Sequence, residues 1–465
     1  MSEVLDEVRT TTLMVRLSAA VEVNPKLDRS SLHDDLDVSF VPMASVEAQS
    51  GVIDLSIVRK YAEVRKGYTY FRDGDILFAK VTPCMENGKM AIARKLVNGI
   101  GFGSTEFHVL RPRAGVDARY VYYFVSSQTF RKQASGHMTG AVGLRRVPSA
   151  YLEEQLIPLP GIDEQRLIVA DVEKQFSRLD EAVANLQRVK ANLKRYKASV
   201  LKDAVEGRLV PTEAELARRE GRGFETGEEF LQRILETRRK EWKGKSRFKE
   251  PVVPNTAVLA TLPQGWTWAT YAQVGDVTTG FTPPTGDVEN FGGNVPFLKP
   301  SDLDVGENVT VAREYLSEKG IAKGRLLKAN SVLVTCIGAT IGKTGLVGVD
   351  CATNQQINAV SPSHDGVVPS FVYHWTVSLA GQAQILDNSS ATTLPILNKS
   401  KFEALGLPLP PKFEQQRIVA EVDRRLSLVR DVEAEVDANL KRAQALRRSC
   451  LASAFVSPKT KEGDS

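Results

Sequence analysis

The strongest constraint on this chain is a stretch of sequence that occurs twice. The first copy begins IPLPGIDEQRLIVADV at Ile157, and the second begins LPLPPKFEQQRIVAEV at Leu407. The copies keep one offset of 250 residues, without a gap, as far as Ala204 and Ala454. A register kept over this length indicates one structural unit used twice. We therefore expect a tandem duplication in which a globular half and a long helix alternate.

Each copy predicts a long helix. The P-L-P triplets cannot continue a preceding helix, because proline restricts the residue before it. Asp163, Glu164 and Glu414 then fall in the first turn, where the helix dipole favours acidic groups. Apolar residues recur every three or four positions in the first helix, at Val172, Phe176, Leu179, Val183, Leu186, Val189, Leu193, Tyr196 and Val200. In the second helix they are Ile418, Val422, Leu426, Val429, Val432, Val436, Leu440 and Leu446, with Ala443 and Cys450.

This apolar seam, flanked by charged residues, is typical of a coiled coil. Two successive steps of three, from Val183 to Leu186 to Val189, predict local overwinding. One alternative is that each helix packs on its own globular half. However, about forty residues of helix reach roughly 60 Å at about 1.5 Å per residue, which would overshoot such a half. We therefore expect the two helices to pair with each other as a spacer.

Composition narrows the class of protein. A chain of 465 residues with 42% hydrophobic content predicts a globular protein of several domains, and a net charge of +5 permits a polyanionic partner without requiring one. The four cysteines form no C-x-x-C pair, which favours a reducing compartment. The N-terminus is polar rather than a signal peptide, and no apolar run is long enough for a membrane span. We expect a cytoplasmic protein.

The two globular halves repeat one order of elements. In residues 1–157 we expect strands in SFVPMASVE, GDILFAKVTP, MENGKMAIA and FGSTEFHVLRP, then an amphipathic helix over residues 118–135 and a basic loop. Residues 251–407 repeat this order, with SVLVTCIGATIGKTGLVG and ATNQQINAVSP in matching places. Residues 158–250 hold the first long helix, a charged helical extension and a basic linker, and residues 408–465 hold the second long helix and a tail.

Together these motifs resemble the specificity subunit of type I restriction–modification systems. The resemblance is carried by the doubled P-L-P…E-Q-x-x-I-V-A-x-V helix, the L-P-x-G-W opening at residues 262–266, and the K-P-S-D, I-G-K-T and A-T-N-Q-Q signatures. It implies an α+β protein with two tandem α/β target-recognition domains, joined by two long helices that form an antiparallel coiled-coil spacer, with pseudo-twofold symmetry. It also implies double-stranded DNA as ligand, with two methyltransferase (modification) subunits and restriction (translocase) subunits as partners. Those partners would bring S-adenosylmethionine, ATP and Mg²⁺, and this chain itself is expected to bind no cofactor.

The first half departs from these signatures. It has N-G-K-M at residues 87–90 in place of I-G-K-T, and G-S-T-E at residues 103–106 in place of A-T-N-Q-Q. This difference fits two halves that read different DNA sequences.

The residues themselves indicate a reader of DNA without catalysis. The stretch IGATIGKT at residues 337–344 fails the phosphate-loop spacing, because Ile337 stands where a glycine is required. An N-P-P-aromatic loop, expected of a methyltransferase that acts on an adenine amine, is missing. The five histidines form no metal-binding spacing. We therefore expect no catalytic residue and no metal ligand.

Polar loop tips on strands are where contacts to bases and phosphates arise, because Gln and Asn pair with adenine and Lys or Arg with guanine or phosphate. In the first half the candidates are Lys80, Thr82, Asn87, Lys89, Arg145 and Arg146. In the second half they are Lys299, Ser301, Thr335, Lys343, Thr344, Asn354, Gln355 and Gln356. The alternatives are that Asn354 and Gln355 form a turn, and that Lys343 and the paired arginines are merely solvated. The helix aromatics are expected in the core rather than stacked on bases, namely Tyr120, Tyr122, Tyr123, Phe124, Phe371, Tyr373 and Trp375.

A diverged duplication predicts an asymmetric, bipartite DNA target, with the helix pair setting the separation of its two halves. Two other classes of protein stay open. An enzyme with restriction or methyltransferase chemistry of its own would turn over DNA alone. A coiled-coil adaptor would show no salt-dependent DNA binding in its complex.

Overall fold

The computed structural model describes residues 13–455, apart from residues 29–31, 142, 245–246, 363–365 and 391–393. The polar N-terminus considered above and the C-terminal tail lie outside the described residues. Contacts divide the chain into two compact units, residues 1–188 with 436–465, and residues 189–435. Each unit holds one globular domain and part of each of two long helices, so the division between the units runs through those helices.

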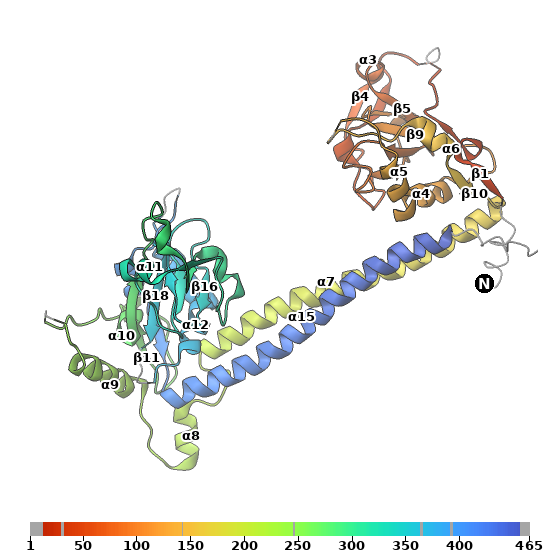
Figure 1. Ribbon diagram of the computed structural model, residues 1–465. Helices are drawn as coiled ribbons and strands as arrows, with labels where there is room; N and C mark the ends of the chain where they lie inside the picture. The colour runs from red at the N-terminus through yellow and green to blue at the C-terminus, as the bar shows by residue number, and fades with distance from the viewer. Residues whose placement is uncertain are drawn as a thin grey trace, which may run out of the picture. The chain divides into compact units, whose positions relative to one another are not determined.

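The first domain is built on two four-stranded sheets (Figure 1). One is antiparallel, in the order β2 (Val21–Val23), β9 (Phe107–Pro112), β6 (Ile76–Ala79) and β7 (Met90–Ile92). The other has the order β4 (Val58–Lys60), β3 (Asp37–Val41), β8 (Ile100–Gly103) and β5 (Thr69–Arg72), with β3 and β8 parallel. Strand β6 is buried on both faces. Because side chains alternate along a strand, Ile76 and Phe78 pack in the core beneath the helices, while Leu77 and Ala79 pack in the core with the other sheet.

The remaining elements of this domain are short. Strands β1 (Met14–Arg16) and β10 (Leu156–Pro158) form an antiparallel pair, and the helices are α2 (Leu17–Ala20), α3 (Tyr61–Val64), α4 (Ala118–Ser126), α5 (Gln128–Gly136) and α6 (Ser149–Glu154). The single amphipathic helix predicted over residues 118–135 is therefore two helices. The break occurs because Ser127 is extended and its hydroxyl accepts a hydrogen bond from the N–H of Phe130 at 3.2 Å, which caps α5.

The second domain repeats this arrangement, which confirms the duplicated fold. Its antiparallel sheet has the order β12 (Gly275–Thr279), β18 (Ile357–Pro362), β15 (Val332–Thr335) and β16 (Thr344–Leu346). Its mixed sheet has the order β14 (Glu314–Leu316), β13 (Phe291–Leu298) and β17 (Ala352–Thr353). Strands β11 (Thr267–Thr270) and β19 (Gly406–Leu409) form the short pair, and the helices are α10 (Tyr271–Val274), α11 (Glu318–Lys323), α12 (Pro369–Val377), α13 (Leu379–Asp387) and α14 (Lys399–Glu403).

The stretch predicted as one strand before the amphipathic helix is two strands that belong to different sheets. Strand β8 pairs with β3 and β5, whereas β9 pairs with β2 and β6. Strands β17 and β18 divide the second copy in the same way. The chain therefore turns from one sheet to the other at residues 104–106 and again at residues 354–356, and we call these segments the sheet corners.

The long helices are α7 (Ile162–Val205) and α15 (Lys412–Ala454). They lie side by side and antiparallel within each unit (Figure 1). In the first unit Phe176 of α7 shares a core with Cys450 of α15. In the second unit Lys197 of α7 pairs with Glu433 of α15 at 2.6 Å. Early residues of one helix thus meet late residues of the other, as the predicted spacer requires.

The seam of α15 is a regular heptad, because Val422, Val429, Val436, Ala443 and Cys450 are all buried at intervals of seven. Four residues predicted in the two seams are instead 40–57% exposed, namely Val189, Tyr196, Val432 and Leu446. In α7 the half-buried Lys197 takes the seam position beside Tyr196. Val189 is therefore not a buried seam residue, and the overwinding predicted from it stays a prediction.

A buried glutamine ties each domain to its long helix. Gln165 is 1% exposed and donates to the last carbonyl of its P-L-P triplet at 2.8 Å, while it accepts from the N–H of the α4 cap residue at 2.9 Å. Gln415 is fully buried and does the same with the carbonyl of Pro410 at 2.9 Å and the N–H of Val368 at 2.9 Å. We call this contact the glutamine tie. It explains why the motif places a glutamine directly after the first acidic turn.

The charged stretch between the halves is helical, as predicted, and forms α8 (Glu213–Glu220) and α9 (Gly227–Lys240). It is anchored on the start of α15. The buried carboxylate of Glu414 accepts hydrogen bonds from the indole N–H of Trp266 and the backbone N–H of Glu213, both at 2.8 Å. Burial raises the pKa of Glu414. Glu414 thus lies in the first turn, as expected, but serves as a buried acceptor.

Within the described residues, every helix is either too short or too polar to cross a lipid bilayer.

Candidate nucleic-acid interface

Four of the six candidates in the first domain lie together at its sheet corner. Lys80 and Thr82 follow β6, and Arg145 and Arg146 lie in the loop before α6. The N–H of Thr82 donates to the carbonyl of Arg145 at 3.0 Å, and the N–H of Lys80 donates to the carbonyl of Glu106 at 2.9 Å. Three segments that are separated in sequence therefore meet at one surface.

Glu106 is a member of this group that the sequence reasoning missed. Its carboxylate forms an ion pair with Arg146 at 2.7 Å, and the hydrogen bond from Arg146 holds the pKa of Glu106 below its usual range. The carboxylate fixes the direction of the guanidinium, which has N–H donors left over. Arg145 is exposed and forms no ion pair within the described ranges. The only signal in the sequence was the acidic residue in G-S-T-E.

Asn87 and Lys89 lie further along the same segment, close to the start of β7. Asn87 is exposed, whereas the ammonium group of Lys89 donates to the carbonyl of Met43 at 3.1 Å. Lys89 therefore joins the turn to the chain that follows β3.

The sheet corner of the second domain is made of Asn354, Gln355 and Gln356. Asn354 is 8% exposed, and its side chain both donates to Oε1 of Gln356 at 2.9 Å and accepts from the N–H of Gln356 at 3.2 Å. It is therefore a turn former, the alternative considered above. Gln355 is exposed, and its Oε1 accepts from the hydroxyl of Thr282 at 2.6 Å. Of the three, Gln355 presents its amide at the surface.

The two lysine candidates of the second domain are both held by carboxylates. Lys343 pairs with Asp304 at 2.5 Å, and Lys299 pairs with Glu314. Lys343 is therefore not the merely solvated side chain of the alternative. Ser301 is exposed in the short 3-10 helix that follows Lys299.

Two further candidates lie inside the second domain. Thr335 of β15 is fully buried, and its hydroxyl has no hydrogen-bond partner among the described residues. Thr344 is 7% exposed and donates to the carbonyl of Gly342 at 2.8 Å. Both side chains therefore lie inside the domain, at the base of the loop between β15 and β16, and not on the surface of that loop. DNA contact by any of the fourteen candidates stays a prediction.

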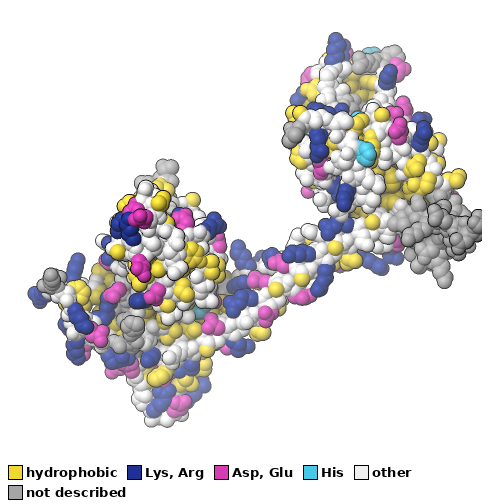
Figure 2. All heavy atoms as spheres, viewed as in Figure 1, with side chains coloured by type: hydrophobic (Ala, Val, Ile, Leu, Met, Phe, Trp, Pro, Cys, Tyr) yellow, Lys and Arg dark blue, Asp and Glu magenta, His cyan; other side chains and the backbone are white. Residues whose placement is uncertain are grey.

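Of the seven helix aromatics predicted in the core, Tyr120, Phe371, Tyr373 and Trp375 are buried there, whereas Tyr122, Tyr123 and Phe124 are only partly buried and pack against it. Tyr120, Phe371 and Trp375 are at most 3% exposed, and the hydroxyl of Tyr120 donates to the carbonyl of Pro158 at 2.7 Å. Charged side chains of both signs are mixed over each domain and along the helices in Figure 2.

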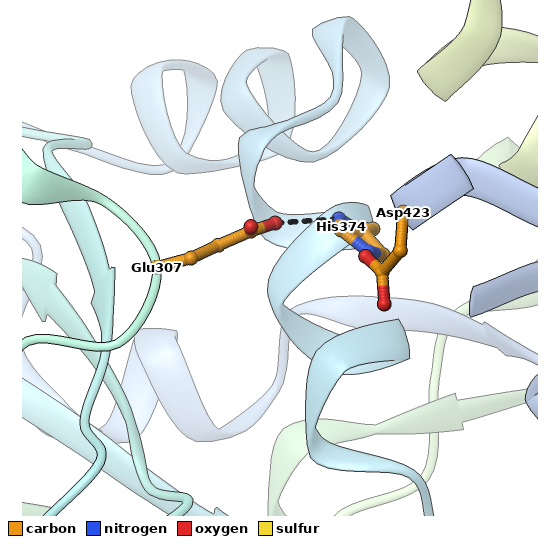
Figure 3. A group of neighbouring side chains, drawn as sticks. All are labelled: Glu307, His374 and Asp423. Atoms are coloured by element: carbon orange, nitrogen blue, oxygen red, sulfur yellow. Dashed lines mark ion pairs between the residues drawn. The ribbon is translucent and has the colours of Figure 1, made fainter. Parts of the chain in front are cut away.

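One titratable cluster lies at the junction of α12 and α15 in the second unit (Figure 3). His374 is buried, with Nδ1 3.7 Å from a carboxylate oxygen of Glu307 and Nε2 3.6 Å from one of Asp423. The two carboxylates face different ring nitrogens, and the guanidinium of Arg430 lies 3.5 Å from Glu307. Because a metal ion binds one nitrogen of an imidazole and is repelled by a guanidinium, this arrangement is poorly suited to a metal centre.

Known proteins share both the sequence and this fold. The sequence profile of the type I restriction modification DNA specificity domain matches residues 15–195 and 263–438. The specificity subunit of the type I restriction enzyme EcoAI from Escherichia coli is 26% identical over 464 residues, covering 88% of this chain and 76% of that protein. The EcoBI specificity subunit from Escherichia coli is 25% identical, covering 68% of this chain and 61% of that protein.

Two solved structures show the same fold. A structure from work on complex assembly and conformational transition of the type I R-M system matches with a TM-score of 0.68 and 20% identity, over 95% of this chain and 97% of that chain. The HsdS subunit from Thermoanaerobacter tengcongensis matches with a TM-score of 0.53 and 21% identity, over 95% and 96% of the two chains. The chain therefore belongs to the family of type I restriction–modification specificity subunits, the non-catalytic subunits that recognise the DNA sequence.

Proposed function

We propose that this subunit reads an asymmetric, bipartite DNA target, with each domain reading one half. The supporting observation is the contrast between the two sheet corners. They occupy the same place in the duplicated fold, yet one carries Ser104, Thr105 and Glu106 and the other carries Asn354, Gln355 and Gln356. Equivalent positions with different donors and acceptors would select different bases.

The chemistry of each corner points to a different kind of contact. In the first domain, the exposed Arg145 and the carboxylate-held Arg146 offer guanidinium groups suited to guanine or phosphate. In the second domain, the exposed amide of Gln355 is suited to adenine, and the carboxylate-held Lys343 and Lys299 are the candidate cations. Phosphate contacts would place the domains, and base contacts would give the sequence.

Two modification subunits and restriction subunits would complete the complex. The exposed apolar residues Tyr196 and Leu446 stand at equivalent helix positions, 250 residues apart, and are 45% and 57% exposed. A duplicated apolar surface offers two equivalent docking sites, which supports two modification subunits. These would bring S-adenosylmethionine, while ATP and Mg²⁺ would bind to the restriction subunits, in the cytoplasm.

The test is co-expression with a modification subunit encoded beside this chain, followed by mapping of methylated bases across a host genome. We expect methylation confined to one split motif and lost when this chain is deleted. Replacing residues 1–156 with those of another specificity subunit should change one half of the motif only. Methylation that does not depend on this chain would contradict the proposal, and a change in both halves would contradict the division of reading between the domains.

A residue-level control separates reading from assembly. Gln355→Ala should relax the second half of the motif, whereas Gln416→Ala, an exposed glutamine on α15, should leave the motif unchanged. Removing one good base contact should cost about 1–3 kcal/mol of discrimination.

A further inference from the structure

Each domain carries a loop between its last two helices, α5 and α6 in the first domain and α13 and α14 in the second. We call residues 144–146 and residues 394–396 the corner loops, because each of these segments is hydrogen-bonded to the chain that adjoins its sheet corner. The first corner loop has the sequence Leu-Arg-Arg, and the second has the sequence Leu-Pro-Ile. Two cations at the surface of one reader are thus replaced by two uncharged residues in the other.

Backbone hydrogen bonds show which residues of the corner loops correspond. In the first domain the N–H of Thr82, three residues after β6, donates to the carbonyl of Arg145 at 3.0 Å. In the second domain the N–H of Gly338, three residues after β15, donates to the carbonyl of Pro395 at 3.0 Å. Strands β6 and β15 occupy the same place in the duplicated sheets, so Arg145 corresponds to Pro395.

The neighbouring hydrogen bonds give the same correspondence. The residue that follows each corner loop donates from its N–H to the carbonyl of the residue that follows the strand, at 2.9 Å to Lys80 in the first domain and at 2.8 Å to Cys336 in the second. The last residues of the two corner loops, Arg146 and Ile396, therefore correspond. An isoleucine thus stands where the first domain has one of its two candidate arginines.

The sheet corners align in the same way. The residue that follows the strand donates from its N–H to the carbonyl of Glu106 at 2.9 Å in the first domain, and to that of Gln356 at 2.7 Å in the second. Glu106 and Gln356 therefore correspond. In the first domain the side chains at the two positions touch, because Arg146 pairs with Glu106 at 2.7 Å. The same positions in the second domain hold Ile396 and Gln356, so the isoleucine lies at the edge of the amide-bearing sheet corner.

The apolar side chains of the second corner loop lie at the surface. Ile396 is 40% exposed and Leu394 is 52% exposed. Leu144, the counterpart of Leu394, is 59% exposed, so an exposed leucine is common to both corner loops and the isoleucine is the change. The second corner loop therefore offers apolar surface where the first offers guanidinium groups.

We propose that Ile396 contacts the C5-methyl group of a thymine in the second half of the DNA target. This inference rests on the proposed function, in which the second domain reads that half. The methyl group is the apolar feature that thymine presents in the major groove, and apolar side chains recognise it by contact. The exposed amide of Gln355 is suited to adenine in the same groove, so both side chains select A·T pairs. The guanidinium groups at the corresponding place in the first domain are suited to guanine instead.

Two features favour a base over an apolar surface of a partner protein. The two modification subunits of the proposed complex are copies of one chain, so surfaces that dock them would carry like residues at corresponding positions. Arg146 and Ile396 correspond but differ in charge and polarity, as contacts to two different half-sites would. In addition, a stable protein interface takes about 800 Å² from each partner, far more than two partly exposed side chains supply.

The experiment uses the full chain with its modification subunit and DNA duplexes that carry the mapped motif. Deoxyuridine in place of thymine removes the methyl group and leaves the base pair intact. Placed at each thymine of the second half in turn, it should weaken binding about fourfold at one position, the effect of one buried methyl group. Fluorescence anisotropy at one fixed salt concentration gives the affinities, and thermal unfolding checks the fold of each variant.

Ile396→Ala removes the protein side of the contact. This variant should bind the thymine duplex about fourfold more weakly than the wild type does. It should bind the deoxyuridine duplex equally well, because the two changes break one contact and their effects do not add. Leu379→Ala is the matched control, since Leu379 is 70% exposed at the start of α13, the end of that helix away from the corner loop. The control should bind like the wild type and keep the fourfold effect of deoxyuridine.

Three outcomes would overturn the inference while the proposed function stands. They are a second half without thymine on either strand, deoxyuridine without effect at every thymine of that half, and an unchanged deoxyuridine effect in Ile396→Ala. If Ile396→Ala weakens binding of the modification subunit and keeps the deoxyuridine effect, the corner loop faces a protein and the inference is again overturned. If methylation follows no split motif that depends on this chain, the proposed function itself fails, and the inference fails with it.

Discussion

The glutamine tie gives the sharpest prediction about stability. Gln415 is fully buried, and its amide satisfies the carbonyl of Pro410 and the N–H of Val368. Gln415→Ala would leave two buried polar backbone groups without these partners and would also open a cavity. A buried group left unsatisfied costs about 1–3 kcal/mol, so we expect a loss of about 2–4 kcal/mol in the free energy of unfolding of the second unit.

Urea unfolding of the full chain, followed by hydrogen exchange, measures this loss and locates it. At a denaturant slope of about 3 kcal/mol per molar, the midpoint of the second unit should fall by about 1 M. Exchange should increase in α12 and in the first turns of α15, while the first domain stays unchanged. Gln165→Ala should produce the mirror result, in α4 and α7.

Gln416→Ala is the matched control, because it removes the same side chain from the adjacent, exposed position of the same helix. The free energy of unfolding of this control should stay within about 0.5 kcal/mol of the wild-type value. If Gln415→Ala and Gln416→Ala unfold alike, the tie contributes nothing and the reading of the repeated E-Q motif is refuted.

Three further predictions concern charge and length. Asp75→Ala should lower the free energy of unfolding by about 3 kcal/mol, because it leaves the nearly buried guanidinium of Arg111 without its carboxylate. Asp34→Ala, which breaks an exposed ion pair, should lower it by less than about 1 kcal/mol. Urea unfolding compares the two variants, and equal losses would contradict the reasoning. Although burial of Glu213 would raise its pKa, hydrogen bonds from its two arginine partners outweigh that effect and lower it. Its stabilisation is therefore present above the unfolded pKa, near 4.5, and is lost as the pH falls through the lower folded pKa. The stability difference between wild type and Glu213→Gln should shrink below pH 4.5 in urea titrations, and a difference independent of pH would contradict this assignment. Inserting one heptad into both long helices should lengthen the unread spacer of the methylated motif without changing either half, and an unchanged spacer would remove the role of the helices as a ruler.

Much of the architecture could be predicted because it repeats along the chain. The helix starts, the order of strands and the burial of four of the seven helix aromatics follow from local patterns of proline, acidic and apolar residues. The errors arose where a local pattern admits two structures. A buried apolar run is compatible with one strand or with two, so the sheet corners were missed, and two overlapping apolar series in α7 made Val189 and Tyr196 look like seam residues.

The candidate site was only partly predictable for a related reason. Polar residue types at strand ends identified candidates in or near the two sheet corners, but the exposure of each side chain depends on what packs over it. Thr344 belongs to the I-G-K-T signature, yet both it and the candidate Thr335 are buried. Glu106, which holds Arg146, has no feature of its own in the sequence that distinguishes it from other surface glutamates.

The sequence by itself determined the duplication, the paired long helices and the divergence of the two readers, because each of these is a pattern along one dimension that needs no knowledge of distant contacts. Only the tertiary structure decided which side chains meet. Glu106 pairs with Arg146, 40 residues later in the sequence, and Glu307 pairs with Arg430, which follows the rest of the second domain in the sequence. Such pairs depend on the path of the chain between them.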